Sequence, residues 1–313
     1  MYSSTAFDIQ CNIISFRGTV MREKKIAFIG GDGRQGAAAE RVSELGYSVT
    51  VYGIPEVVGG RVRRLERLDA AYDADVLVLP LPMSGDGVTV NCVGAFRDKA
   101  PRIDDIFANA KNIPICAGRI QPKIKSEAER LGIRLFDYFL SEELMIKNAY
   151  LTAEGAISLS MNELGISLGG AKVAVIGYGR IGKFLARMLD SLGASVTVAA
   201  RRTTDLAYAS CFGYGTLKIS VSQGKSSLSL LNSCDVVFNT APYWLFDSTV
   251  LKDFSQRTLM IDLSSAPGGF DPKAVKEYGI SLICAPGLPG KYAPMTAGSF
   301  VGDAIVELLP KML

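Results

Sequence analysis

The stretch K-V-A-V-I-G-Y-G-R-I-G, residues 172–182, decides the fold of this 313-residue chain. An apolar run at 173–176 meets three glycines at G-x-G-x-x-G spacing, and a helix-like pattern follows. Gly177 permits a tight turn off a strand, Gly179 lets the backbone approach a pyrophosphate, and Gly182 lets helix and strand pack closely. A strand before the motif and a helix after it are the context that this motif requires, so the sequence predicts a dinucleotide-binding βαβ unit. The alternative is a glycine turn that serves packing alone.

The strand predicted next, Ala194–Ala200, ends without the acidic residue that binds the adenosine ribose in NAD enzymes. Arg201, Arg202 and Thr203 stand there instead, and the guanidinium group matches phosphate geometry. We therefore expect NADP as the cofactor, with NAD as the alternative; the two arginines could also form a solvated loop. The predicted cofactor-binding residues are Gly177, Gly179, Arg180, Ile181, Gly182, Arg201, Arg202, Thr203, Asn239, Thr240 and Asp262.

The same unit occurs earlier in the chain. An offset of 147 residues (177 minus 30) lays the motif on I-A-F-I-G-G-D-G-R-Q-G, residues 26–36, without a gap. The sequence S-V-T-V recurs at the same offset, at 48–51 and 195–198. Two βαβ starts of equal length predict an α/β protein of two Rossmann-like, doubly wound parallel-sheet domains with a cleft between them.

The first copy of the motif is altered at two of its glycines. The second glycine becomes Asp32 and the third becomes Gln35. A carboxylate at the point of closest approach would repel a pyrophosphate, so we do not expect the dinucleotide there. Asp32, Arg34 and Gln35 instead cluster at the carboxyl end of a strand, where open α/β sheets bind ligands, and we predict that they contact substrate. A surface loop with ordinary polar residues is the alternative.

Composition excludes several classes of protein. The net charge of +3 is spread without long blocks, which argues against nucleic-acid or membrane-surface binding. No apolar run approaches the roughly 20 residues of a membrane span, and the first 20 residues lack a signal-peptide pattern. Six cysteines lie far apart without metal-ligand spacing, so we expect a reduced cytoplasmic protein without a metal site.

The chain contains no histidine. This absence excludes a histidine-dependent catalytic triad, a His-ligated metal and an imidazole acid or base. Proton transfer must therefore use Asp, Glu, Lys, Tyr, Cys or water. The chain thus lacks the His–carboxylate pair on which many hydroxyacid dehydrogenases rely.

The pattern of the chain predicts four segments. Residues 1–23 form an N-terminal tail, 24–145 a Rossmann-like substrate domain, 146–290 the NAD(P)-binding domain with a connector helix, and 291–313 a C-terminal helix near the domain junction. Strands are predicted at 26–29, 48–51, 76–79, 114–117, 133–136, 173–176, 194–200, 236–239, 259–262 and 281–284. A mostly helical connector is predicted over 141–168 and a last helix over 293–309.

Three further segments carry residues suited to chemistry. The loop L-P-L-P-M-S-G-D-G, residues 79–87, could offer backbone N–H groups around Ser84 and Gly85 to an anion, or could be a tight turn. The loop C-A-P-G-L-P-G-K-Y-A-P-M-T-A-G, residues 284–298, could aim Lys291 and Thr296 at a substrate, although surface lysines are usually just solvated. Glu154 lies on the otherwise apolar connector, either exposed or as a base facing the cleft. Glu154 and Lys291 are the predicted catalytic residues.

Five motifs together resemble the family of dipicolinate synthase A subunits from spore-forming bacteria. They are G-G-D-G-R-Q (30–35), T-A-E-G (152–155), V-I-G-Y-G-R-I-G (175–182), D-L-S-S-A-P-G-G (262–269) and A-P-G-L-P-G-K-Y-A-P-M-T-A-G (285–298). The last is the most specific, and it is also similar to the proline-glycine loop of methylenetetrahydrofolate dehydrogenases. The resemblance covers residues 24–309.

The resemblance implies a cytoplasmic sporulation enzyme that oxidises a dihydrodipicolinate-type intermediate to pyridine-2,6-dicarboxylate. It implies NADP as hydride acceptor and a separate, flavoprotein-like B subunit as partner; a homo-oligomer is a further expectation. Loss of a hydride and a proton makes an aromatic ring, so no strong imidazole base is needed. Two substrate carboxylates call for cationic and N–H donors, which Arg34, Lys291 and the Ser84 loop could supply.

Two other functions remain open at this point. The chain could be another two-domain NAD(P)-dependent dehydrogenase, acting on a 2-hydroxy acid, an amino acid or a folate. It could also be a non-catalytic NADP-binding subunit. The polar cluster at Asp32–Gln35 counts against the second alternative, because a pure sensor needs no second polar cleft.

Overall fold

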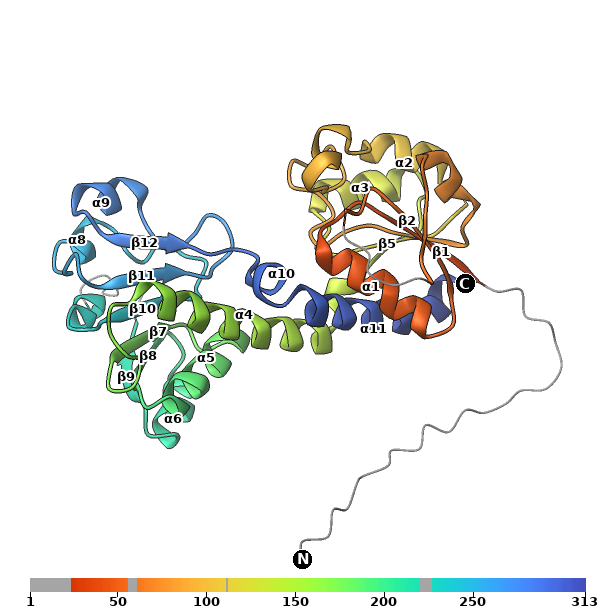
Figure 1. The fold of residues 1–313 in the computed structure, drawn as a ribbon. Coiled ribbons are helices and arrows are strands. Elements are labelled where there is room, and N and C mark those ends of the chain that lie inside the picture. The colour runs from red at the N-terminus through yellow and green to blue at the C-terminus, as the bar shows by residue number, and fades with distance from the viewer. Residues whose placement is uncertain (1–23, 56–60, 111, 220–226) are drawn as a thin grey trace, which may run out of the picture.

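The computed structural model describes residues 24–55, 61–110, 112–219 and 227–313, and the tail predicted at 1–23 lies outside them. Two lobes make up the molecule, each built on a six-stranded parallel sheet with helices on both faces (Figure 1). The prediction of two doubly wound α/β units is confirmed. Within the described residues, no helix combines the length and the apolar character that crossing a lipid bilayer requires.

The first lobe has the strand order β3-β2-β1-β4-β5-β6. Its elements are β1 (Lys25–Ile29), α1 (Gly33–Glu44), β2 (Ser48–Tyr52), β3 (Arg63–Arg64), η1 (Leu68–Asp73), β4 (Val76–Val78), η2 (Gly94–Lys99), α2 (Ile103–Asn109), β5 (Ile115–Ala117), α3 (Pro122–Arg130), β6 (Leu135–Asp137) and η3 (Tyr138–Leu140), where η marks a short 3-10 helix. The order reverses between β1 and β4, which makes that point the crevice where ligands bind in such sheets.

The second lobe repeats this order as β9-β8-β7-β10-β11-β12. Its elements are β7 (Lys172–Ile176), α5 (Arg180–Ser191), β8 (Ser195–Ala200), α6 (Thr203–Cys211), β9 (Gly215–Lys218), η4 (Ser229–Leu231), β10 (Val236–Asn239), α8 (Ser248–Leu251), β11 (Leu259–Asp262), α9 (Pro272–Glu277) and β12 (Ser281–Cys284). Helix α4 (Glu142–Glu163) leads into this lobe, and α10 (Leu288–Tyr292) and α11 (Pro294–Met312) lead back from it (Figure 1).

The central strands are buried on both faces, which explains their uninterrupted apolar sequences. In β7, Val173 and Val175 pack into one core cluster, whereas Ala174 and Ile176 pack into the cluster on the opposite face. The β1 strand divides in the same way between two clusters of the first lobe. The two motifs that match in sequence therefore also occupy matching positions in the two sheets.

Helix α11 packs in the first lobe although it follows the second. Its apolar residues Val301, Ile305 and Leu309 are buried in a core cluster with Phe28 of β1. Small residues make the approach close, because a Cβ added to Gly298 would overlap the backbone oxygen of Arg34 in α1. The chain thus crosses between the lobes twice, once in α4 and once through α10 and α11.

Most differences from the sequence prediction lie at the edges of the sheets and at the ends of elements. The edge strands β3 and β9 are not predicted, because they are short and largely polar and exposed. The strand expected at 133–136 is β6, displaced by two residues at its start. The last helix, expected at 293–309, is α11 and continues to Met312, whereas the loop expected at 284–298 contains the short helix α10.

We predict that Gly298→Ala destabilises the protein, because the added methyl group meets backbone atoms of α1 that cannot move aside. The expected loss in the free energy of unfolding is about 1–3 kcal/mol, measured by urea denaturation. Gly165→Ala is the matched control, since open space surrounds its Cβ, and a change within about 0.5 kcal/mol is expected there. Equal stability of the two variants would contradict the close α1–α11 packing.

Candidate functional site

The glycine turn of the second lobe has the geometry of a dinucleotide site. Gly177 has a φ of +91°, and a Cβ on it would lie 2.5 Å from the Thr240 hydroxyl oxygen. A Cβ on Gly182 would overlap the Gly177 carbonyl group. Gly179 is different: it is the N-cap of α5, and no atom lies within 4 Å of its added Cβ. Two glycines therefore serve packing, and the third leaves open space at a helix N-terminus, where a pyrophosphate fits.

The equivalent turn of the first lobe is filled. Gln35 takes the place of the third glycine, is only 3% exposed, and its Nε2 donates to the Val78 carbonyl of β4 at 3.4 Å. A Cβ on Gly31 would lie 2.5 Å from that of Gln35. The side chain of Gln35 therefore occupies the crevice between β1 and β4. It acts as an internal packing group, and a direct contact with substrate stays a prediction.

Asp32 and Arg34 pair with each other. Asp32 is the N-cap of α1, and its carboxylate accepts from Arg34 Nε at 3.0 Å and from Arg34 Nη2 at 2.8 Å. Arg34 Nη2 also donates to the Leu81 carbonyl at 2.7 Å. Gly290 of α10 lies over the guanidinium, since its added Cβ would be 2.8 Å from Arg34 Nε. The charge of Arg34, which was predicted to bind a substrate carboxylate, is thus largely compensated by Asp32. The pair also helps to position α10.

The arginines at the end of β8 have different surroundings. Arg202 forms a bidentate ion pair with Asp205 at 2.8 Å, which raises the pKa of Arg202. Arg201 stacks on the Tyr243 ring, with its guanidinium carbon 4.3 Å from the ring centroid. Tyr243 follows β10, so the stack joins the loops after β8 and β10. Thr203 begins α6 and is exposed beside them.

Two other predicted cofactor residues lie on the second lobe's α5. Arg180 pairs with Glu142 of α4, Nε to Oε1 at 2.8 Å, which raises the pKa of Arg180 and lowers that of Glu142. Ile181 packs against the core of the lobe. Arg180 therefore ties the helix that carries the glycine turn to the connector helix.

Asn239, Thr240 and Asp262 lie at the carboxyl ends of β10 and β11, where they form the floor of the second lobe's crevice. Asp262 is 5% exposed; its Oδ1 accepts from Asn239 Nδ2 at 2.9 Å and its Oδ2 from the Gly269 N–H at 2.8 Å. Ser264 donates to Asp262 as well, through its N–H and its hydroxyl group. Thr240 donates its hydroxyl hydrogen to the Ile176 carbonyl at 2.8 Å. Asp262 therefore holds the loop at 263–269, and its contact with the cofactor stays a prediction.

The loop around Ser84 is held in shape by the carboxylate of Asp86, which lies within the loop. Ser84 is 3% exposed; it donates to Asp86 at 3.0 Å and accepts from the Gly87 N–H at 2.9 Å. Hydrogen bonds from the backbone N–H groups of Thr89 and Val88 hold the pKa of Asp86 well below its usual range. The Gly87 N–H is therefore used inside the loop, while Gly85 lies exposed at its tip.

The two predicted catalytic residues are exposed and are not brought together by any hydrogen bond or ion pair between them. Glu154 lies on α4 next to Gly155, whose added Cβ would be 2.9 Å from that of Leu288 in α10. Lys291 lies on α10, and Thr296 lies in the first turn of α11. All three are therefore close in the chain to the crossing between the lobes, on elements that pack together.

One residue at this crossing was missed from the sequence. Arg119 follows β5, and its Nη2 donates to the Ser265 hydroxyl oxygen of the second lobe at 2.8 Å. The signal available in the sequence was its place in C-A-G-R-I, just after a predicted strand of a parallel sheet. The sequence analysis also did not predict Tyr243, which stacks on Arg201 and likewise follows a predicted strand of a parallel sheet.

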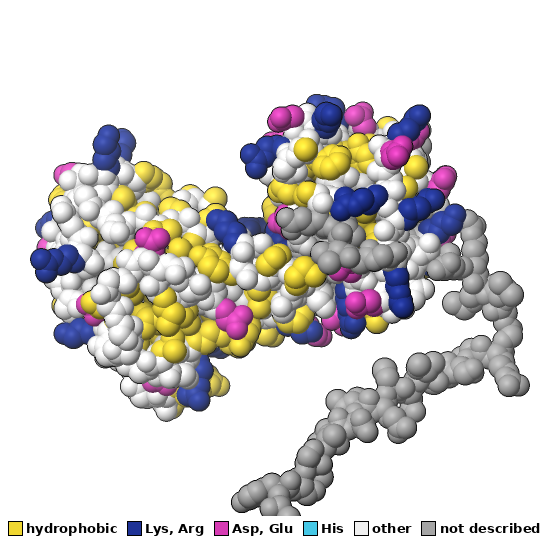
Figure 2. Space-filling view, viewed as in Figure 1, with side chains coloured by type: hydrophobic (Ala, Val, Ile, Leu, Met, Phe, Trp, Pro, Cys, Tyr) yellow, Lys and Arg dark blue, Asp and Glu magenta, His cyan; other side chains and the backbone are white. Residues whose placement is uncertain are grey.

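The surface is notched between the two lobes, and Lys or Arg side chains lie at the bottom of the notch (Figure 2). The carboxyl ends of the central strands carry the glycine turn and the Asn239–Asp262 floor on one lobe and the Ser84 loop on the other. A dinucleotide on the second lobe and an anionic small molecule against the first fit this arrangement.

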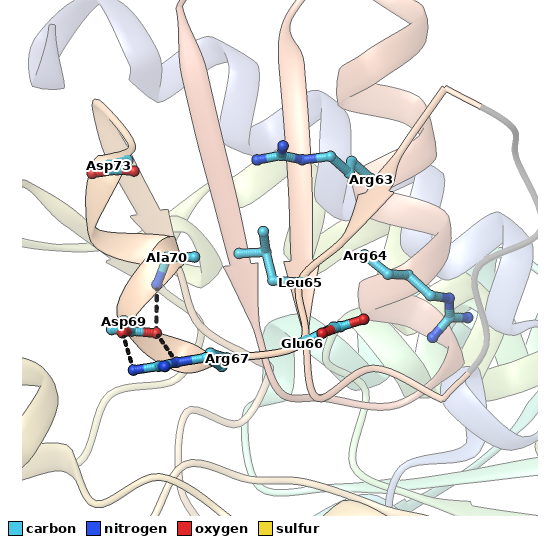
Figure 3. A pocket seen from close by; sticks show the side chains of 8 residues that line it. All are labelled: Arg63, Arg64, Leu65, Glu66, Arg67, Asp69, Ala70 and Asp73. Carbon is cyan, nitrogen blue, oxygen red and sulfur yellow. Dashed lines mark hydrogen bonds and ion pairs between the residues drawn. The ribbon is translucent and has the colours of Figure 1, made fainter.

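A separate hollow of about 570 Å³ lies at the β3 edge of the first lobe (Figure 3). Its lining mixes charges: Arg63, Arg64, Leu65, Glu66, Arg67, Asp69, Ala70 and Asp73. Arg67 is paired with Asp69 at 2.6 Å, and Arg64 donates to the carbonyl groups of Ile54 and Pro55. None of the predicted site residues lies there, so the hollow is not the candidate site.

Comparison with known proteins matches both lobes. The family model of the N-terminal domain of the dipicolinate synthase A subunit matches residues 25–139, and that of the alanine dehydrogenase/PNT C-terminal domain matches residues 150–312. The dipicolinate synthase A subunit of Bacillus subtilis (strain 168) is 30% identical over 292 residues, which cover 92% of this chain and 96% of that protein.

Solved structures agree with these matches. The crystal structure of the dipicolinate synthase A subunit from Bacillus halodurans has a TM-score of 0.79 at 27% identity, covering 91% of this chain and 97% of that one. A transhydrogenase from Sinorhizobium meliloti has a TM-score of 0.63 at 16% identity, covering 92% and 93%, and shows the same fold alone.

We predict that Gly179→Asp, which copies the residue of the first lobe, strongly weakens dinucleotide binding without loss of stability. Aspartate is a favoured N-cap and meets open space here, so the melting temperature is expected to stay equal or rise. The carboxylate would repel a pyrophosphate by roughly 4 kcal/mol at contact, so the Kd for NADP, measured by calorimetry, should rise at least about 100-fold.

Gly179→Asn is the matched control, because it caps the helix and fills the same space without a charge. It should weaken binding much less than the aspartate. Unchanged binding in the aspartate variant would remove the dinucleotide from this turn.

Proposed function

The chain belongs to the family of dipicolinate synthase A subunits, and we propose that it oxidises a dihydrodipicolinate-type intermediate to pyridine-2,6-dicarboxylate with NADP as the hydride acceptor. It is an oxidoreductase of the NAD(P)-dependent dehydrogenase type. The observation that carries the proposal is the contrast between its two glycine turns. The turn of the second lobe is open at Gly179, whereas Gln35 fills that of the first. One lobe is thereby suited to the cofactor and the other to the substrate.

The residues of the second lobe fit a dinucleotide. The open N-terminus of α5 suits the pyrophosphate, and Arg201 stands where a 2′-phosphate would be bound, held in place by Tyr243. A nicotinamide ring bound beyond it would supply the hydride acceptor. The buried Asn239–Asp262 pair keeps the loop at 263–269 in a fixed shape beside that position. These residues bind and orient the cofactor, and they transfer no proton.

Substrate binding falls to residues of the notch. We propose that Lys291, which is exposed on α10, and the tip of the Ser84 loop face a substrate carboxylate. Asp32, Arg34, Gly85 and Thr296 are proposed to line the same region, with the Asp32–Arg34 pair fixing α10 and the buried Gln35 supporting the turn from inside. Cationic and N–H donors of this kind match carboxylates.

Glu154 is proposed to accept the proton. It is exposed on α4, directly before the Gly155 contact with α10, and it has no ion pair with any residue of the described part of the chain. Removal of a hydride and a proton from the dihydro ring leaves an aromatic pyridine, so a carboxylate or water suffices as base. The absence of histidine from the chain is compatible with this chemistry.

The proposal includes a partner and a setting. Because the relatives are named as one lettered component of a synthase, we propose that a separate B subunit completes the enzyme and that the enzyme acts during sporulation.

The proposed reaction is tested by incubating the purified chain with NADP and a dihydrodipicolinate source, with and without the B subunit. We expect one NADPH per pyridine-2,6-dicarboxylate, followed at the near-ultraviolet absorbance of each. A panel of 2-hydroxy acids, amino acids and folates, offered in place of the dihydro compound, is the control. Turnover of a panel member without turnover of the dihydro compound would assign the chain to another dehydrogenase class.

For cofactor choice, we predict that Arg201→Ala lowers the affinity for NADP by about 10- to 100-fold and hardly changes that for NAD. The reason is that Arg201 carries no carboxylate partner among the described residues, so its charge is available for a phosphate. Arg202→Ala is the matched control, because that arginine is already neutralised by Asp205. Equal losses for NADP and NAD in Arg201→Ala would refute the 2′-phosphate role.

A further inference from the structure

Arg119 is the point at which the first lobe reaches across to the second. It stands directly after β5, and its partner Ser265 stands in the loop after β11. Both side chains are exposed, so a small molecule can reach them. Both loops leave the carboxyl ends of parallel strands, the edge at which open α/β sheets bind their ligands.

Arg119 differs in its pairing from two other arginines near the crossing. Arg34 is paired with Asp32, and Arg180 is paired with Glu142. Arg119 forms no ion pair within the described part of the chain, and the side-chain partner it has there is the neutral Ser265 hydroxyl group. That bond uses one of the five N–H groups of a guanidinium, so the charge and most of the planar fork remain available to an anion.

The backbone at Arg119 is held in an unfavourable conformation. Its φ of +53° makes it the one non-glycine residue with a left-handed backbone in the described part of the chain. Asp137 fixes this shape, accepting from the Arg119 N–H and from the Ile120 N–H at 3.0 Å each. Strain that the surroundings hold in place is typical of functional positions, where it aims a side chain.

The partner loop is fixed as firmly. Asp262 holds the residues on both sides of Ser265 through the Ser264 and Gly269 N–H groups. The loop follows β11, in the half of the second sheet that lies beyond the switch point between β7 and β10. In a dinucleotide-binding sheet of this order, one mononucleotide half lies on each side of the switch point. Because Arg201 is assigned to the adenosine half, Ser265 lies on the nicotinamide side.

We propose that Arg119 binds one carboxylate of the dicarboxylate substrate through its guanidinium fork, beside the nicotinamide position. Ser265 holds the guanidinium in place when no substrate is bound. Arg119 is thus a specificity-determining residue that selects a diacid over a monoacid. The proposal rests on the proposed function for the identity of the diacid, and its test is a binding measurement that needs no turnover.

The test measures the binding of pyridine-2,6-dicarboxylate and of pyridine-2-carboxylate to the full chain saturated with NADP, by calorimetry. The native protein should bind the diacid more tightly than the monoacid. In Arg119→Gln the Kd for the diacid should rise about 10- to 100-fold, and the preference for the diacid should largely disappear. Arg119→Lys, which keeps the charge and loses the fork, should fall between the two.

Two further variants separate binding from a structural role. Arg130→Gln removes an exposed charge on α3 of the same lobe and should leave both Kd values unchanged. Ser265→Ala removes the contact between the lobes while keeping the cation, and it should weaken the diacid less than Arg119→Gln does. Equal losses in Ser265→Ala and Arg119→Gln would make Arg119 a latch between the lobes and overturn the proposal.

Unchanged diacid binding in Arg119→Gln, or no diacid binding by the native protein, would overturn it as well. The oxidation assay separates this failure from that of the proposed function. Turnover of the dihydro compound with an unaffected Arg119→Gln would leave the reaction standing and remove Arg119 from it. Diacid selection that depends on Arg119 without any turnover would do the reverse.

Discussion

Helix α11 leaves the second lobe and packs its glycines against α1 of the first, and the relation of the two lobes depends on this contact. Gly298 brings the two helices so close that no side chain fits between them. One step earlier in the chain, Gly290 of α10 lies on the guanidinium of Arg34, and Leu288 meets α4 at Gly155. The chain therefore passes from the first lobe to the second through α4 and returns to the first lobe in its last 26 residues (288–313). The walls of the notch are positioned by this double crossing.

The two lobes share one strand order and use it for different purposes. Electrostatics and space decide the difference at a single turn. In the second lobe the helix N-terminus points into open space at Gly179. In the first lobe, Asp32 caps the equivalent helix and turns its charge toward Arg34, while Gln35 takes the space. A cofactor on one side and a charged substrate on the other are what this asymmetry supports.

Much of the fold could be predicted from the sequence, because the glycine motif and the buried strands are decided within about ten residues. The glycine turn, its repeat at the earlier position and the connector helix belong to this class. The site could be predicted from the sequence less completely. Asp32 neutralises Arg34 beneath Gly290, Arg202 pairs with Asp205, and Arg201 stacks on Tyr243. These contacts depend on where side chains turn after packing. Arg119 was missed because its partner is 146 residues away. The polar edge strand β9 carries no hydrophobic pattern that could have indicated it.

The left-handed backbone of Arg119 also has a consequence for stability. A non-glycine residue in this region costs the folded state about 1 kcal/mol relative to glycine. The natural residue is therefore the less stable choice at this position, and a glycine there would make a sturdier protein that had lost its guanidinium. At this position the proposed anion contact is therefore obtained at the expense of folding stability.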